Sequence, residues 1–384
     1  MIKSVKNPVS DLFAFLMLPP KRNKVLKNGA DTPLPQTYSV NRLADHLHPK
    51  VQLLPIIEIV EHKWAKTFVF GGDSAPFRAG QYVSINLKIG DANLTRPYSI
   101  SSGPKQGTAI TVKRDENGFA SPWILDNWKV GDIISMSAPE GTFCYEPMRD
   151  EKNVIGIAGG SGITPFLSMA RAIRDGIEDF NLTILFGNRT EEDILFKSEF
   201  DEICAATNRV KVVHVLSDEQ REGYVQGFIT ADVIKKYAGK AYSVFLCGPS
   251  AMYRFVDQEL NKLGLDRKYI RHELFGAPKS PVGMAGYTGN PEAVYSLTVH
   301  TTSATRVVPM KACEPVLVAV ERAGIEAPSR CRGGECGWCR TRLIQGIYFV
   351  PEHMEYRRAA DKKHNYIHLC STFPLGDMEI EAKI

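Results

Sequence analysis

The chain has 384 residues, of which 43% are hydrophobic and 23% charged, as in an ordinary folded protein. Its 47 Lys and Arg against 43 Asp and Glu leave a net charge of +4, too balanced for a dedicated nucleic-acid-binding protein. The longest apolar run near the N-terminus, residues 12–18, is much shorter than the ~20 residues of a membrane-spanning helix. We therefore expect no membrane span, and this length predicts two or three domains.

Residues 1–51 are interpreted as an N-terminal extension, because Lys, Asn and Pro interrupt any helical period. The apolar run in it lacks a small-residue cleavage site and is followed by PPKR, so no secretory signal is expected. Four of the eight Cys gather in one short C-terminal region, which is typical of a metal site in a reducing compartment. We therefore expect a cytoplasmic protein.

Residues 52–149 contain short β-rich runs separated by turns, at 81–90, 96–103, 109–118 and 133–141. This pattern predicts a small antiparallel barrel or sandwich. One helix-like interruption lies near residues 122–128.

From residue 150 to 275 the pattern changes to strands alternating with helices. The expected strands are 154–159, 181–188, 210–217 and 242–249, and the expected helices are 165–176, 197–207, 230–239 and 250–264. Such alternation predicts a parallel sheet covered on both faces, which binds ligands at the carboxyl ends of its strands. Residues 276–292 hold four Gly and three Pro and are interpreted as a linker that lets the following unit, 293–384, swing.

The cysteines of that last unit have the spacing of a plant-type [2Fe-2S] site. Cys331, Cys336 and Cys339 share one glycine-rich loop, and Cys370 follows thirty residues later. Four thiolates must converge on two irons, and the loop glycines allow backbone amides to turn toward the cluster. A zinc ribbon is the alternative, but it usually has two Cys-x-x-Cys pairs, whereas this region has one.

The flavin signature follows a strand-like run. Arg96-Pro97-Tyr98-Ser99 resembles the Arg-x-Tyr-Ser motif of the ferredoxin–NADP reductase superfamily. The resemblance implies that Arg96 pairs with a flavin phosphate, that Tyr98 stacks on the isoalloxazine ring, and that Ser99 lies near its N5 atom. The segment from Gly118 to Ser121 resembles the pyrophosphate-binding segment of the same family, which favours FAD over FMN.

The nicotinamide signature begins with GGSGITP at residues 159–165, a glycine-rich turn between an apolar strand and a helix. We expect Gly160 and Gly162 to expose amides to a dinucleotide phosphate and Thr164 to cap the helix. Cys247-Gly248-Pro249, at the end of the last strand, resembles the family motif in which the Cys packs near nicotinamide C4.

Glu273-Leu274-Phe275 resembles the end of the reductase core. This resemblance implies that Phe275 covers a flavin face and that Glu273 organises the nicotinamide or the proton supply. Arg189 follows the second strand of the parallel sheet, where it can meet a 2′-phosphate, so NADPH is favoured over NADH. Glu191 or Glu192 could instead hold a ribose hydroxyl. The basic pair Lys113-Arg114, just before the Gly118–Ser121 segment, could add contacts to the flavin pyrophosphate, and a solvated strand end is the alternative.

The resemblance covers about residues 52–384. It implies an antiparallel β-barrel flavin domain (52–149), an α/β nucleotide domain (150–275) and an α+β, β-grasp ferredoxin domain (293–384). Reductase components of this arrangement feed oxygenases and related metalloenzymes, among them phenylacetyl-CoA epoxidase, ketosteroid hydroxylase and hybrid-cluster types. The implied function is hydride transfer from NAD(P)H to FAD near Ser99, Cys247 and Glu273, and then single-electron transfer through the cluster to a partner metalloenzyme.

Three alternatives remain, one of which is a [2Fe-2S] binding or sensor module in which the nicotinamide motifs have no role. The chain could be the electron-transfer subunit of a larger flavoenzyme complex, or a stand-alone NAD(P)H oxidase or flavin reductase. Trp338, within the cluster loop, is a candidate for the electron exit surface. Four arginines around the loop are candidates for binding an acidic partner: Arg330, Arg332, Arg340 and Arg342.

Overall fold

The protein is represented by a computed structural model, which describes residues 51–116, 118–273 and 280–382 together with positions 13, 16, 17 and 20. The chain forms two compact units, Met1–His48 and Pro49–Ile384, and only the second is described below. The predicted extension, residues 1–51, therefore lies almost wholly outside the described residues, as does Phe275. No helix of the described part combines the length and the apolar composition needed to cross a membrane.

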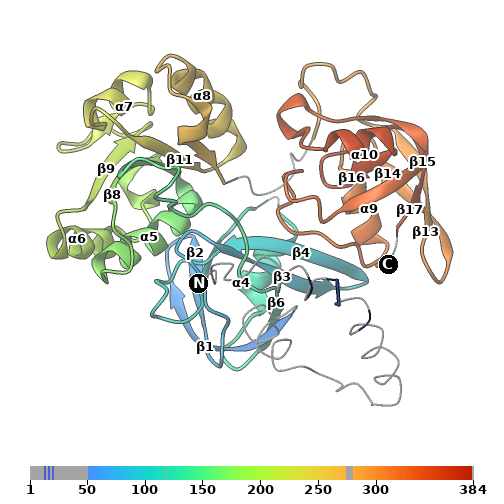
Figure 1. Cartoon of the computed structure of the whole chain (residues 1–384), viewed down its shortest axis with the longest axis horizontal. Helices are drawn as coiled ribbons and strands as arrows, with labels where there is room; N and C mark the ends of the chain where they lie inside the picture. Colours follow the sequence, from blue (N-terminus) through green and yellow to red (C-terminus); the bar gives the residue numbers. More distant parts are fainter. Residues whose placement is uncertain are drawn as a thin grey trace. The chain divides into compact units, whose positions relative to one another are not determined.

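The first sheet has six strands in the order β4-β3-β6-β1-β2-β5, and all its pairs are antiparallel (Figure 1). An isolated bridge between Ile100 and Ile110 curls it into the antiparallel half-barrel expected of the flavin domain. Helix α4 (Ala120–Asn127) packs Ile124 and Leu125 into the apolar core of the barrel. The strands are β1 (Gln52–Glu61), β2 (Ala65–Phe70), β3 (Tyr82–Ile89), β4 (Ala92–Ser99), β5 (Ala109–Lys113) and β6 (Ile133–Met136).

The second sheet is parallel throughout, with the order β10-β9-β8-β7-β11-β12. Helices α5 and α6 pack on one apolar core of this sheet, and α7 and α8 on another, as the parallel arrangement requires (Figure 1). The strands are β7 (Asn153–Gly159), β8 (Asn181–Asn188), β9 (Val210–Leu216), β10 (Val225–Gln226), β11 (Ser243–Cys247) and β12 (Ile270–His272). The helices are α5 (Thr164–Arg174), α6 (Lys197–Ala206), α7 (Ala231–Tyr237) and α8 (Ser250–Asn261), with the short turns η1 (Gly160–Ile163), η2 (Glu191–Asp193) and η3 (Arg267–Tyr269).

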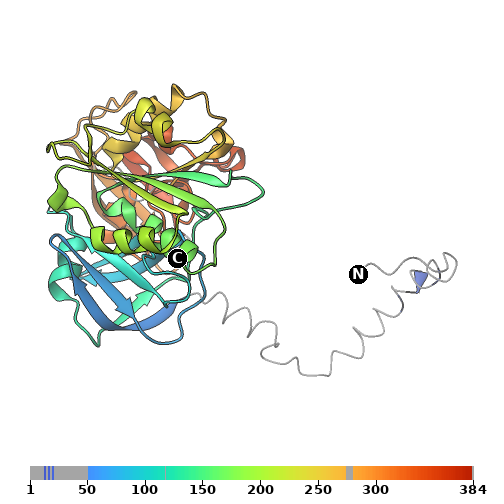
Figure 2. The ribbon, with the colours of Figure 1, turned by 90° about the vertical axis from the view of Figure 1, so that its left-hand side faces the viewer.

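Helix α5 lies between the two sheets (Figure 2). Ser168 of this helix donates its hydroxyl to the Ser102 carbonyl at 2.7 Å, and Arg171 donates to the Ser101 carbonyl at 3.0 Å. Phe166, also on α5, lies edge-on to Phe143, which follows the last barrel strand. The barrel and the parallel sheet therefore share a polar and an apolar interface along this helix.

The third sheet is mixed, with the order β14-β13-β17-β15-β16, and only the β13–β17 pair is parallel. Helix α9 (Val316–Arg322) crosses it and buries Leu317 and Val320 in its core. The described part of the predicted linker, residues 280–292, contains turns without helix or strand. The strands are β13 (Val294–His300), β14 (Thr305–Lys311), β15 (Arg340–Phe349), β16 (Tyr366–His368) and β17 (Phe373–Glu381), and α10 (Ala359–Lys363) and η4 (Glu352–Met354) complete this part.

Candidate functional site

The four cluster cysteines fall into two pairs. Cys339 Sγ lies 3.2 Å from Cys370 Sγ, and Cys336 is tied to Cys331 through its amide, 3.4 Å from Cys331 Sγ. Cys336 is exposed, whereas the other three are buried. In the described residues no three His, Cys, Asp or Glu side chains converge tightly enough for a single ion. Two sulfur pairs, three cysteines from the loop and the fourth from the segment after β16, fit the two irons of a [2Fe-2S] cluster, with two thiolates on each iron.

The backbone of the cluster loop requires its glycines. Gly334 and Gly337 have φ values of 86° and 72°, in the region that L-side chains rarely adopt. A Cβ on Gly334 would also lie 2.7 Å from the Met354 carbonyl oxygen. Two loop amides, of Gly333 and Cys336, point at Cys331 Sγ at 3.4 Å each. Two loop amides therefore turn toward a ligand sulfur, and the expected contacts to the cluster itself stay a prediction.

The arginines around the loop are all paired within the chain. Arg340 pairs with Asp361 at 2.5 Å, and Arg342 with Glu381 at 3.1 Å. The remaining pairs are Arg330–Glu140 and Arg332–Glu321. Trp338 is 49% exposed and its ring lies 3.3 Å below the Arg330 guanidinium carbon. The surface around the cluster is thus charge-compensated, which argues against the simple acidic-partner patch expected from the sequence.

A cavity of about 810 Å³ joins the three parts of the chain, and we call it the junction cavity. Its walls come from the barrel, from the end of β12 and from the cluster loop. They include Tyr82, Phe143, Glu273, Cys331 and Cys336. Tyr82 is the register partner of Ser99 on the neighbouring strand. The cavity therefore brings the predicted Glu273 next to two cluster ligands and beside the strand that carries the flavin motif.

Glu273 and Cys247 lie at the carboxyl ends of adjacent parallel strands, β12 and β11. Glu273 N–H donates to the Leu246 carbonyl at 3.0 Å, which fixes the two strand ends in register. Burial raises the pKa of the Glu273 carboxyl well above its ordinary value, and the nearby Glu335 raises it further. Burial likewise raises the pKa of the Cys247 thiol. Both groups therefore favour their neutral forms at neutral pH.

The charge environment of Arg96 is suited to a flavin phosphate. Its guanidinium donates to the Thr95 carbonyl at 2.9 Å and lies 3.5 Å from Glu321, which also pairs with Arg332 at 2.5 Å. Two cations thus share one carboxylate. Burial, and then the cation of Arg332, lower the pKa of Arg96 to about 10. A phosphate would supply the missing negative charge, so the residues fit the group.

The other predicted flavin residues lie on β4 and at the start of α4. Tyr98 packs against the barrel core, and Ser99 is buried. Ser121 accepts a hydrogen bond from Asp115 N–H at 3.1 Å, and its hydroxyl lies 3.2 Å from the position of a Cβ on Gly118. Gly118 and Ser121 thus share one turn, although α4 has no side-chain cap.

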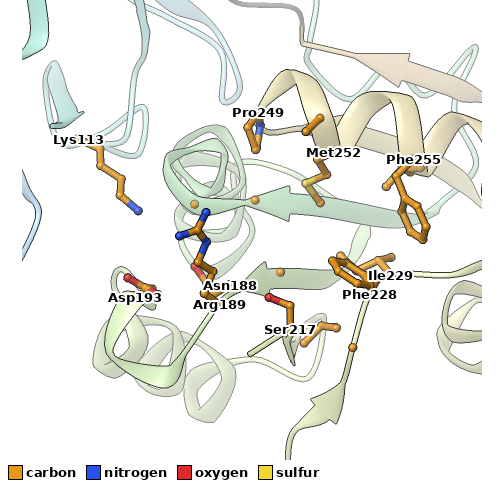
Figure 3. Close-up of a pocket in the computed structure, with 17 residues that line it drawn as sticks. Lys113, Asn188, Arg189, Asp193, Ser217, Phe228, Ile229, Pro249, Met252 and Phe255 are labelled. Carbon is orange, nitrogen blue, oxygen red and sulfur yellow. The ribbon is translucent and has the colours of Figure 1, made fainter. Parts of the chain in front are cut away.

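A second cavity, of about 570 Å³, lies at the carboxyl ends of β7, β8 and β9 (Figure 3), and we call it the nucleotide cavity. Gly160 and Pro249 line it from the predicted motifs, and Arg189 reaches toward Lys113 of β5. Neither of these two cations has a side-chain hydrogen-bond or ion-pair partner among the described residues. Gly162 sits so close to the Cys247 carbonyl that a Cβ would lie 2.2 Å from its oxygen. Gly248 is adjacent, at 2.8 Å from the same position.

The predicted cap by Thr164 is wrong. The turn η1 precedes the helix, so Ile163 occupies the cap position, and Thr164 is the first helical residue. Its hydroxyl donates to the Ser161 carbonyl at 3.0 Å instead. Pro165 does lie in the first turn, as expected. The two acidic candidates for a ribose contact are occupied: Glu191 pairs with Arg221 and Tyr224, and Glu192 with Lys63.

Sequence reasoning missed three features of these sites. Phe228 and Phe255 line the nucleotide cavity with their rings 5.5 Å apart, and only their apolar character could have suggested it. Glu140 lines the junction cavity, where burial raises its pKa to about 7. The Tyr253 hydroxyl accepts a hydrogen bond from Gly248 of the Cys-Gly-Pro segment. No local sequence signal distinguishes Tyr253 from a core tyrosine.

Comparisons with known proteins agree with this arrangement. The family model of the oxidoreductase FAD-binding domain matches residues 66–145, that of the oxidoreductase NAD-binding domain residues 157–258, and that of the 2Fe-2S iron-sulfur cluster binding domain residues 299–375. NADH oxidoreductase HCR of Escherichia coli is 28% identical over 315 residues, which cover 80% of this chain and 89% of that protein. The glycine betaine monooxygenase reductase subunit of Chromohalobacter salexigens is 28% identical and covers 85% and 94%.

Among solved structures, phthalate dioxygenase reductase is 25% identical to this chain, with a TM-score of 0.62. The match covers 87% of this chain and 98% of that one. That protein is described as a modular structure for electron transfer from pyridine nucleotides to [2Fe-2S]. The three family models follow one another in the order of the three sheets. The chain therefore belongs to the ferredoxin–NADP reductase superfamily, as an FAD- and [2Fe-2S]-dependent NAD(P)H oxidoreductase with a C-terminal ferredoxin domain.

Proposed function

We propose that this reductase supplies electrons to the metal-containing terminal component of an oxygenase or hydroxylase. The junction cavity carries the proposal, because its walls unite the barrel, Glu273 of the nucleotide sheet and the ligands Cys331 and Cys336. The name of the glycine betaine monooxygenase reductase subunit supports an oxygenase as the acceptor. A hybrid-cluster protein, the other partner type expected, finds no support among these relatives.

The chemistry of the bound groups sets the task of the residues: FAD accepts a hydride pair and passes single electrons to the cluster. We assign Arg96, Gly118 and Ser121 to the flavin phosphates, and Tyr98 and Ser99 to the ring. Phe275 remains assigned to the ring on sequence alone. Cys247 and Glu273 border the nicotinamide as neutral, buried groups. Their role is therefore to position the nicotinamide ring and to exclude water, rather than to act as bases.

We assign NADPH as the preferred donor. Arg189 and Lys113 both line the nucleotide cavity without a carboxylate partner in the described part of the chain, so an anion there is favoured. Glu191 and Glu192, which would favour the ribose hydroxyl of NADH, are held by Arg221 and Lys63. The pyrophosphate of the dinucleotide is assigned to Gly160, Gly162 and Thr164. Its nicotinamide is assigned to Gly248 and Pro249.

We also propose that the functional domains are residues 52–149, 150–275 and 293–384, with 1–51 as an extension and 276–292 as a linker. The three sheets fall within these ranges. Four free thiols at the cluster site require a reducing compartment, which favours the cytoplasm.

The test is anaerobic rapid mixing of the cofactor-loaded protein with NADPH and, separately, with NADH. Flavin absorbance should bleach first and cluster absorbance second, and NADPH should be the faster donor. A flavin that bleaches while the cluster stays oxidised would contradict the proposed electron route.

The alternative of a stand-alone oxidase or flavin reductase is separated by removing residues 293–384. Under our proposal the truncated chain still reduces small dyes but no longer reduces a protein acceptor. An electron-transfer subunit of a larger complex would instead co-purify with a catalytic flavoenzyme. Neither alternative has an observation in its favour that the reductase assignment lacks.

A further inference from the structure

Tyr253, in the first turn of α8, contacts both segments that we assign to the nicotinamide. Its hydroxyl accepts a hydrogen bond from Gly248 N–H at 3.2 Å and donates one to the Glu273 carbonyl oxygen. The Leu246 carbonyl, at 3.4 Å, is a more distant acceptor. Because a hydroxyl carries one proton, the Glu273 carbonyl takes it and the Gly248 amide fills a lone pair. One oxygen atom therefore joins the end of β11 to the end of β12.

This link extends the sheet beyond its last pair. Strand β12 ends at His272, and the Glu273 amide still reaches the Leu246 carbonyl at 3.0 Å. The Glu273 carbonyl, however, has Tyr253 as its partner instead of a strand. The Gly248 amide, the other partner of this hydroxyl, directly follows Cys247 in the chain. The Glu273 amide and the Tyr253 hydroxyl therefore both tie the end of β12 to the end of β11, and the hydroxyl is the only side-chain group of the two.

The ring of Tyr253 is itself held in place. It packs against the His272 ring with a centroid separation of 5.8 Å, and His272 bonds Asp257 of the same helix at 2.7 Å. Burial raises the pKa of the Tyr253 phenol well above its ordinary value, so the group stays a neutral hydroxyl. Only a neutral hydroxyl can both donate and accept, as these two contacts require.

We propose that Tyr253 is a positioning residue for hydride transfer, whose hydroxyl fixes Cys247 and Glu273 at one separation around the nicotinamide ring. Tyr253 lines neither the nucleotide cavity nor the junction cavity, so it acts through these neighbours. Hydride transfer is sensitive to such placement because the reacting atoms must approach to about 3–3.5 Å. The inference rests on the proposed roles of Cys247 and Glu273.

The substitution Tyr253→Phe keeps the ring and removes only the hydroxyl. In anaerobic rapid mixing with increasing NADPH, flavin reduction at saturation should slow by about tenfold to a hundredfold. The nucleotide Kd should change less than about twofold, because the phosphate and adenosine contacts are untouched. The isotope effect with NADPH deuterated at C4 should rise, and the nicotinamide–flavin charge-transfer absorbance should weaken.

Tyr242→Phe is the matched control, since Tyr242 is a half-buried tyrosine just before β11 whose hydroxyl has no hydrogen bond to either segment in the described part of the chain. It should behave as the unmodified protein. Tyr253→His provides a second variant, because a ring N–H can still donate to the Glu273 carbonyl, and it should recover part of the rate.

Three results would overturn the inference. The first is a Tyr253→Phe protein that reduces its flavin at the unmodified rate. The second is a parallel loss of rate, nucleotide affinity and melting temperature, which marks a purely structural role. The third is an unmodified protein whose flavin neither nucleotide reduces, and that outcome removes the proposed function as well.

Discussion

Arg96 Nη1 lies 3.5 Å from Glu321 Oε2, so a side chain of β4 in the flavin barrel meets a buried carboxylate of α9 in the ferredoxin part. The other oxygen of Glu321 bonds Arg332, in the cluster loop, at 2.5 Å. Asn93, also on β4, donates to the Gly324 carbonyl at 3.1 Å. These contacts favour a ferredoxin domain that is held on the barrel over the swinging domain that the linker composition suggested.

The first prediction concerns Glu321→Gln, which leaves the buried Arg332 and the partly buried Arg96 without their shared carboxylate. Removing one partner of a buried ion pair costs about 3–5 kcal/mol, so the contact between barrel and ferredoxin domain should loosen. Flavin reduction by NADPH should be unchanged, and electron transfer from flavin to cluster should slow by at least about tenfold. Stopped-flow absorbance at flavin and cluster wavelengths separates the two steps.

Glu314→Gln is the matched control for this change, because Glu314 pairs with Arg322 inside the ferredoxin domain. The cluster absorbance must be intact in both variants, since Glu321 also supports the cluster loop through Arg332. Equal flavin-to-cluster rates in Glu321→Gln and the unmodified protein would show that the contact does not set the electron path.

The second prediction concerns donor preference. Arg189→Ala should raise the KM for NADPH and leave that for NADH nearly unchanged. A hydrogen bond to a charged group is worth about 1.5–3 kcal/mol, so the NADPH to NADH ratio of kcat/KM should fall by about ten- to a hundredfold. Steady-state dye reduction measures this ratio. Arg209→Ala is the control, because Arg209 pairs with Asp179 at 2.5 Å and does not line the nucleotide cavity.

An unchanged NADPH to NADH ratio of kcat/KM in Arg189→Ala would contradict this prediction. If the ratio stays the same, Arg189 does not meet the 2′-phosphate. Lys113→Ala then becomes the informative variant, because its ammonium is the other cation of the nucleotide cavity without a partner in the described residues.

Much of the fold follows from local patterns. Four of the six parallel strands follow from apolar runs that precede helical patterns, and β8 coincides with its prediction at residues 181–188. The short strands β10 and β12 are not predicted, because two or three residues carry too little pattern. The cluster loop was predicted because the spacing of Cys331, Cys336 and Cys339 is restrictive in itself. Strands β1 and β2 were not predicted individually, because β1 reads QLLPIIEIVE, with Pro55 in it and no regular alternation of apolar and polar residues.

The parts that sequence reasoning missed depend on partners far apart in the chain. Glu321 meets Arg96 across 225 positions, and a lone Glu in a helix gives no sign of such a partner. The prediction of a Thr164 cap is wrong because a short 3₁₀ turn runs directly into the helix. Ile163 is therefore the cap residue, and Thr164 lies in the first turn. The loop arginines are candidates for an acidic partner in the sequence, because the carboxylates that neutralise Arg330 and Arg332 come from other parts of the chain.

The third prediction is a pH dependence of stability. Burial, only partly offset by Arg330, raises the pKa of Glu140 from 4.5 to about 7. The folded state therefore binds this proton more tightly than the unfolded state. The contribution of Glu140 to stability is complete below pH 4.5 and is lost as the pH rises through about 7.

Glu140→Gln, which mimics the protonated form, should therefore match the unmodified protein near pH 4.5 and exceed its unfolding free energy above pH 7. Urea unfolding at several pH values measures the difference. A Glu140→Gln protein that is less stable above pH 7 would mean that the pair with Arg330 outweighs the cost of burial.

The last prediction concerns the electron exit surface. Because Arg330, Arg332, Arg340 and Arg342 are all paired within the chain, the region around Trp338 presents little net field to an acceptor. Reduction of the protein acceptor should change less than about threefold while the Debye length falls from about 30 Å to about 10 Å. Glu381→Gln removes the partner of the exposed Arg342, so the rate should depend more steeply on salt concentration if the acceptor is acidic. Trp338→Ala should lower the reduction of the protein acceptor at every salt concentration. The reduction of small dyes should not change in Trp338→Ala. A steep dependence in the unmodified protein would instead show that charge steers the partner despite the internal pairing.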